Sequence, residues 1–179
     1  MMEYISFPLL PMSLTQVHIL VESTRQQREN ARRDHLILRL LSEADFYGRE
    51  VCRLRWCDIK PHPPDEFGNY GDIEVYSRKG NIINSIPVGK SLWRELMAWR
   101  RRQVKKCGSS FSEEEYIFLS RKGGKLDYSS IWRIVKRAAN GVEGLSPSCS
   151  PLWLRVAYKR YVVIAHIEGR EVGVPAWVR

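Results

Sequence analysis

The stretch that decides the fold is residues 47–59, which read Tyr-Gly-Arg-Glu-Val-Cys-Arg-Leu-Arg-Trp-Cys-Asp-Ile. We predict a short helix within it, from about Arg49 to Trp56. A longer helix is expected before it, over residues 28–43, because four apolar side chains recur there at helical spacing: Leu36, Ile37, Leu40 and Leu41. A capped helix start at Ser13 opens the sequence upstream of both.

The sequence after residue 59 indicates strands before it returns to helices. Turns rich in proline and glycine lead into a strand and turn over 73–81, and the strand over 86–88 returns from it. The later elements that we expect are helices over 91–106 and 129–139, an extended segment over 116–119, a polar turn over 120–125, a loop over 140–151 and a last helix that carries Arg155. The 179 residues, 44% of them hydrophobic, suit one domain with one core.

Three segments, in their order and spacing, resemble the catalytic domain of the tyrosine recombinases, also called phage integrases. The family's Gly-x-Arg-x-x-Glu, followed by Leu-x-Trp-x-Asp-Ile, is matched within residues 47–59, and its lysine-bearing hairpin resembles residues 73–88. The family's second box, His-x-Leu-Arg-His, is matched in part by residues 152–156. The resemblance covers nearly the whole chain and implies an α+β fold, a mainly helical domain with a small antiparallel sheet.

Several catalytic positions of the family hold other residues in this chain. Tyr47 takes the place of the first arginine and Phe46 that of the glycine before it, while Leu152 and Val156 replace the two histidines. The candidates that remain for the catalytic site are Lys79 and Arg155.

The lost side chains bear on the chemistry that the resemblance implies. In the family, two arginines and a histidine hold the phosphate on which negative charge develops, the hairpin lysine is the acid, and a late tyrosine is the nucleophile. Losing one donor of this type typically costs roughly a hundredfold to a thousandfold in rate. We therefore expect a DNA-binding recombinase or integrase-like protein in which catalysis is degenerate.

The position of the nucleophile supports the same expectation. The last tyrosines, Tyr158 and Tyr161, lie within two turns of Arg155 on one predicted helix, and neither stands at the family position. His166 is eleven residues after Arg155, which is too far along the helix to replace a lost histidine. We divide the chain into an N-terminal tail, residues 1–12, and an integrase-like domain, residues 13–179, that lacks the nucleophile segment.

The charge of the chain favours a nucleic-acid partner. With 29 Lys and Arg against 20 Asp and Glu, the net charge is +9 and the pI about 9.6. Such a charge attracts polyanions and gives salt-dependent binding, so double-stranded DNA is the expected partner. The basic side chains predicted to contact DNA are Arg100, Arg101, Arg102, Arg133, Lys136 and Arg137, although a solvated helix face is the commoner reason for such a run.

Other classes of protein find little support. No stretch approaches a membrane span, no signal peptide is visible, and a cytoplasmic, nucleoid or nuclear setting follows. The four cysteines are too scattered for a disulfide framework or a zinc site, so free thiols are expected and neither a metal nor a cofactor is predicted.

Two other functions stay open at this point. One is an active site-specific recombinase with substituted catalytic residues, and the other is a non-catalytic protein-interaction domain. A homo-oligomer or a complex with a full-length recombinase is a further expectation. Arg155 distinguishes the alternatives, because a guanidinium in an apolar helix needs a partner: Glu50, another carboxylate or a phosphate.

Overall fold

The protein is described by a computed structural model that places residues 12–25, 29–77, 79–120, 122–145 and 149–167. The α-helices within these ranges are α1 (Leu14–Ser23), α2 (Glu29–Glu43), α3 (Gly48–Val51), α4 (Lys90–Cys107), α5 (Tyr128–Ala139) and α6 (Pro151–Ile167). The strands are β1 (Ile59–Pro61), β2 (Asn69–Tyr76) and β3 (Ile82–Gly89), with short 3-10 turns at Trp56–Asp58 and Gly108–Ser110. The expected α+β architecture, mainly helical with a small antiparallel sheet, is confirmed.

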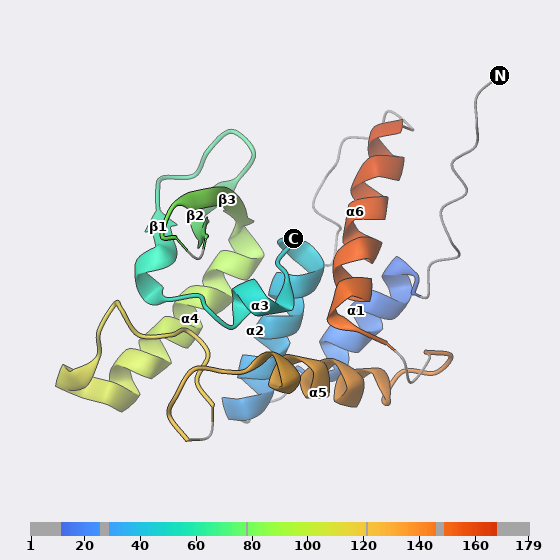
Figure 1. Cartoon of the computed structure of the whole chain (residues 1–179). Helices are drawn as coiled ribbons and strands as arrows, with labels where there is room; N and C mark the ends of the chain where they lie inside the picture. Colours follow the sequence, from blue (N-terminus) through green and yellow to red (C-terminus); the bar gives the residue numbers. More distant parts are fainter. Residues whose placement is uncertain (1–11, 26–28, 78, 121, 146–148, 168–179) are drawn as a thin grey trace.

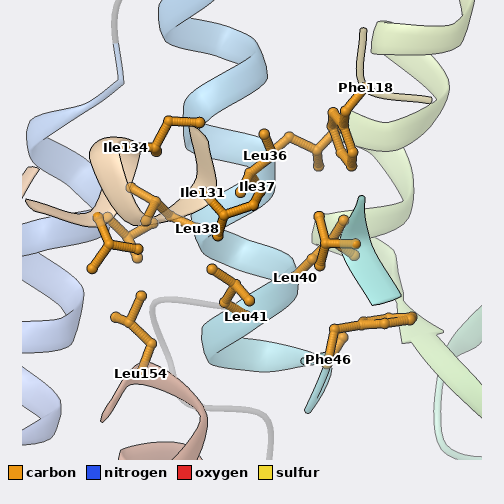
Figure 2. Close-up of a cluster of buried hydrophobic side chains, with 14 of the residues drawn as sticks. Leu36, Ile37, Leu38, Leu40, Leu41, Phe46, Phe118, Ile131, Ile134 and Leu154 are labelled. Atoms are coloured by element: carbon orange, nitrogen blue, oxygen red, sulfur yellow. The ribbon is translucent and has the colours of Figure 1, made fainter. Parts of the chain in front are cut away.

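Helix α2 lies in the middle of the molecule and contacts α1, α3, α4, α5 and α6 (Figure 1). The apolar face predicted from the sequence is buried, and Figure 2 shows it meeting Phe46, Phe118, Ile131, Ile134 and Leu154 from other segments. Leu38, Arg39 and Ser42, on the remaining sides of the helix, are buried as well. Residues 34–42 of the helix are buried on all sides, so Arg39 has to find its partners within the protein.

The sheet is antiparallel in the order β1-β2-β3, with Ile73 of β2 opposite both Ile59 and Ile86. Buried side chains alternate with partly buried ones along β2 and with more exposed ones at the end of β3, as expected of a sheet with one covered face. Helix α4 contacts both long strands (Figure 1). The predicted hairpin is therefore confirmed, and β1 is an additional edge strand that the proline-rich sequence did not indicate.

The predicted helix from Arg49 to Trp56 is wrong in its length. Helix α3 ends at Val51, because the chain then turns to pair with a distant segment: the Ile117 amide donates to the Leu54 carbonyl at 2.9 Å, and Arg55 bridges to Tyr116. The expected extended segment over 116–119 forms only such isolated bridges. Pairing between segments that lie about 60 residues apart cannot be derived from the local pattern of either.

No helix in the described ranges has the length and apolar character needed to cross a membrane.

Candidate functional site

The site begins with an unusual turn at the end of α2. Asp45 has a φ of 56°, the left-handed conformation that glycine adopts most readily. The turn buries Phe46 in the core and leads Tyr47 out in an extended conformation, just before α3. The family glycine therefore corresponds to Asp45, two residues before Tyr47, and the assignment of that glycine to Phe46 was wrong.

Arg155 of α6 lies directly against this turn. Its Nε is 2.8 Å from the Asp45 carboxylate oxygen Oδ1 and donates to the Asp45 backbone carbonyl at 2.9 Å, while Nη2 donates to Oδ2 at 3.2 Å. Lys159, one turn further along α6, also reaches Asp45, at 3.1 Å. Of the partners that the sequence left open, another carboxylate is correct and Glu50 is wrong. The Glu50 carboxylate instead accepts from the Tyr47 amide at 2.8 Å and closes the first turn of α3.

Tyr47 occupies the face of the same guanidinium. The central carbon of Arg155 lies 3.6 Å from the centroid of the Tyr47 ring, a close cation–π stack. The residue at the position of the lost arginine thus contacts the arginine that remains. The edge of Arg155 is held by Asp45 and one face is covered by Tyr47, which leaves 13% of its side chain exposed.

A pocket of about 420 Å³ opens beside this stack, and we call it the Tyr47 pocket. Its walls come from the turn, from α3 and from the first turns of α5 and α6: Phe46, Tyr47, Gly48, Arg49, Glu50, Tyr128, Pro151, Leu152 and Arg155. The structure thereby brings together three of the positions that the sequence singled out, Tyr47, Leu152 and Arg155. Tyr128 belongs to the pocket as well, but no sequence signal pointed to it.

A second pocket of about 570 Å³ shares Arg49 and Glu50 with the first and extends to Ser77 and Gly80 of the β2–β3 turn; we call it the hairpin pocket. Lys79 is exposed on that turn. The charges that line the hairpin pocket are balanced, four cations (Arg49, Arg53, Arg55, Lys60) against four carboxylates (Glu50, Asp58, Glu74, Glu114). Some pair directly, since Lys60 lies 3.3 Å from Glu74 and Arg55 lies 3.1 Å from Glu114.

The three consecutive arginines of α4 diverge instead of forming one face. Successive helical residues are rotated by about 100°, so Arg100 and Arg102 point to different sides. Arg100 pairs with Glu113 and lies 5.6 Å from the ring centroid of Phe111. Arg102 lines a separate pocket of about 280 Å³ on another side of α4, and Arg101 is exposed.

The basic residues of α5 are all exposed, but each has a neighbour within the domain. The Arg133 guanidinium donates to the Ser129 hydroxyl at 2.9 Å, and Lys136 lies 5.6 Å from the ring centroid of Trp132. Arg137 reaches the buried Asp34 at 3.2 Å while its own side chain is 66% exposed. Contact of the α4 and α5 cations with DNA stays a prediction.

A different group of charges lies inside the protein, around α2. Arg39 donates two hydrogen bonds to Glu43, at 2.8 and 2.7 Å, and lies 3.2 Å from Glu95 of α4, which is 3.4 Å from His35. Burial alone would raise the pKa of Glu95, but His35 and Arg39 outweigh burial and lower that pKa to about 2. His35 is therefore part of the internal packing.

The cysteines do not form a reactive site. All four are free, as expected, and burial raises the pKa of Cys52, Cys57 and Cys149 to about 11, so their thiols stay protonated at neutral pH. Tyr158 lies on α6, whereas the side chains of Tyr161 and His166 lie outside the described part of the structure.

Comparisons with known proteins show the family and the fold of the chain. The model of the phage integrase family matches residues 12–160. Tyrosine recombinase XerC of Alcanivorax borkumensis is 26% identical over 146 residues, which are 82% of this chain and 44% of that protein. The chain therefore spans less than half the length of this curated relative.

Solved structures show the same fold at low sequence identity. XerA recombinase superposes with a TM-score of 0.66 at 19% identity, over 90% of this chain and 53% of that one. The XerH recombinase in its pre-cleavage complex with difH gives a TM-score of 0.67 at 12% identity, over 93% of this chain and 45% of that one.

Proposed function

Because the chain belongs to the phage integrase family, we propose that it binds double-stranded DNA as a component of a DNA recombination or integration system. The fold shared with recombinases and the net charge of +9 support this proposal. Residues 13–179 would act as one unit, and the setting would be the cytoplasm, the nucleoid or the nucleus.

The second part of the proposal is that this chain does not itself break DNA. The observation that carries it is the engagement of Arg155 by Asp45 and Tyr47. A phosphate in the transition state needs N–H donors directed at its oxygens. Here Nε and Nη2 of Arg155 are used internally, and Leu152 and Val156 carry no donor in their side chains.

Lys79 and the six cations of α4 and α5 are the side chains that we propose for phosphate contact. The Arg100–Glu113 ion pair lies at the surface, and surface ion pairs are weak enough, at about 0–1 kcal/mol, to be exchanged for a phosphate. The partner of Arg137, Asp34, is buried but is also held by Arg33, so it keeps a partner if Arg137 turns to a phosphate. A second copy of the chain or a full-length recombinase is the proposed protein partner on the DNA.

DNA binding is tested by fluorescence titration of a labelled duplex at two salt concentrations. Neutralising several phosphates releases counterions, so we expect measurable affinity that falls steeply as salt rises. Absence of binding at low salt, or affinity that salt does not change, would contradict the proposal and favour a protein-interaction domain.

Loss of catalysis is tested with a nicked duplex that traps covalent protein–DNA adducts. The protein is incubated with this substrate and separated on a denaturing gel, beside an active tyrosine recombinase on its own site as the positive control. We expect no covalent band from this chain. A band that disappears in Tyr158→Phe or Tyr161→Phe would instead establish an active recombinase with a displaced nucleophile.

A further inference from the structure

Exposed apolar side chains gather around the Tyr47 pocket. Nine large apolar residues are exposed in the described part of the chain, and three of them, Tyr47, Tyr128 and Leu152, line this one pocket. Scattered surface apolar residues need no explanation, but a cluster around a concave site indicates a ligand with apolar surface. A volume of about 420 Å³ lies within the range of pockets that hold small organic groups.

The Tyr47 ring is held by the protein on one face and open to solvent on the other. The Arg155 guanidinium covers one face of Tyr47, yet the residue is 50% exposed, so its exposed area belongs to the opposite face and the edge. Arg155 is in turn held by Asp45, which keeps the stack in place. Tyr47 therefore presents a flat surface that is already ordered. Stacking a ligand on it costs little side-chain entropy, because the ring is held in place before the ligand binds.

Tyr128 is placed by the glycine at the start of α3. A Cβ atom on Gly48 would lie 2.8 Å from Cε2 of Tyr128, so only glycine lets the ring approach the backbone this closely. The guanidinium carbon of Arg49 lies 5.5 Å from the centroid of the same ring. Arg49 is exposed at the rim, where its charge is available to an anionic group at the pocket mouth.

We propose that the Tyr47 pocket holds one unpaired nucleotide of DNA, with its base stacked on Tyr47 between Tyr128 and Leu152 and its phosphate at Arg49. This inference rests on the proposed DNA binding and specifies its substrate as DNA with an unpaired base. Every base has a π-face, so stacking on aromatic rings tolerates any sequence, and an arginine beside the rings adds attraction for the backbone. The replacements at Tyr47 and Leu152 both exchange a phosphate donor for apolar surface, which suits a base ring.

The test compares two labelled duplexes that differ only in one unpaired 2-aminopurine nucleotide. Affinities are measured by anisotropy at one ionic strength, and 2-aminopurine emission reports stacking. We expect tighter binding of the bulged duplex with quenched emission. Removing one base–aromatic stack typically costs about 1–3 kcal/mol, so Tyr47→Ala should lower the ratio of the two affinities by roughly fivefold to a hundredfold.

Matched variants separate stacking from general damage. Tyr47→Phe keeps the ring and should keep the preference, and Phe67→Ala removes an exposed aromatic side chain outside the pocket and should change nothing. Leu152→Asp places a carboxylate in the exposed first turn of α6, where the helix tolerates it, and should abolish the preference even if Tyr47→Ala fails to fold.

The outcomes distinguish this inference from the function on which it rests. Equal affinity of the wild-type protein for the two duplexes, or a preference that survives both Tyr47→Ala and Leu152→Asp, would overturn the unpaired-nucleotide site while leaving DNA binding intact. Failure to bind either duplex would overturn the proposed function itself.

Discussion

Arg39 and Arg155 are both largely buried arginines on core helices, yet their surroundings differ. Arg39 contacts two carboxylates, Glu43 and Glu95, and the Ser91 hydroxyl, and its side chain is 4% exposed. Arg155 contacts one acidic residue and an aromatic ring, and it borders an open pocket. The Arg39 guanidinium lines none of the described pockets, although its partner Glu95 is partly exposed, whereas the Arg155 guanidinium itself lines the Tyr47 pocket.

The difference shows that burial alone does not assign an arginine to structure or to function. A buried charge must be paired in either case, because an unpaired guanidinium in an apolar interior is strongly unfavourable. The two differ in what is accessible: at Arg39 only a partner, Glu95, borders a pocket, whereas at Arg155 the guanidinium itself does.

The largest expected effect is that of Arg39→Met compared with Arg155→Met. Arg39→Met leaves the buried Glu43 without its partner, a change that typically costs about 3–5 kcal/mol and should lower the Tm by roughly 10 °C. Arg155→Met leaves Asp45 partly solvated and still near Lys159, so its effect should be clearly smaller. Thermal unfolding followed by circular dichroism measures the Tm of both variants. An equal fall in Tm would contradict the distinction between Arg39 and Arg155.

The second largest effect is expected from acid, which should lower the free energy of unfolding through Glu95, a partner of Arg39. The pKa of Glu95 is about 2 in the folded protein against 4.5 for an ordinary glutamate, so its stabilising effect is complete above pH 4.5 and is lost as pH falls toward 2. After allowance for solvent screening of a partly exposed group, the loss is about 2 kcal/mol. Urea unfolding at several pH values in this range measures the loss. The variant Glu95→Gln has no titrating group at residue 95, so its stability should depend less on pH.

A smaller effect is expected from Asp45→Asn. Asparagine tolerates the left-handed conformation, so the turn should persist while the charge partner of Arg155 and Lys159 is lost. We expect a loss of about 1 kcal/mol in stability and a gain in duplex affinity at low salt, because a carboxylate leaves the site and two cations are released. Unchanged DNA affinity would show that Asp45 does not keep Arg155 from contacting DNA.

The smallest expected change in stability is that of Lys79→Ala. The side chain is exposed on a turn, so the Tm should not move, while a lost phosphate contact should reduce the salt slope of DNA binding by about one. Lys122→Ala, at another exposed position, is the matched control. If both variants weaken binding equally, Lys79 contributes only general positive charge.

The sequence predicted those parts of the fold whose evidence is local. The apolar spacing in α2 and α5 and the strand hairpin were recognisable, because each element's periodicity is set by its own geometry. The length of α3 and the edge strand β1 were not, because they depend on pairing with distant segments, such as that of Leu54 with Ile117.

The same division holds at the site. Residues 47–59 and 152–156 by themselves determined the family and showed which catalytic positions hold other residues, because those facts lie in residue identity and spacing. Only the tertiary structure decided that Asp45, 110 residues earlier in the chain, is the partner of Arg155, and that Tyr47 covers its face. It also brought Tyr128 into the pocket. A guanidinium's need for a partner is a property of the residue, but which partner it finds depends on which segments the core packs together.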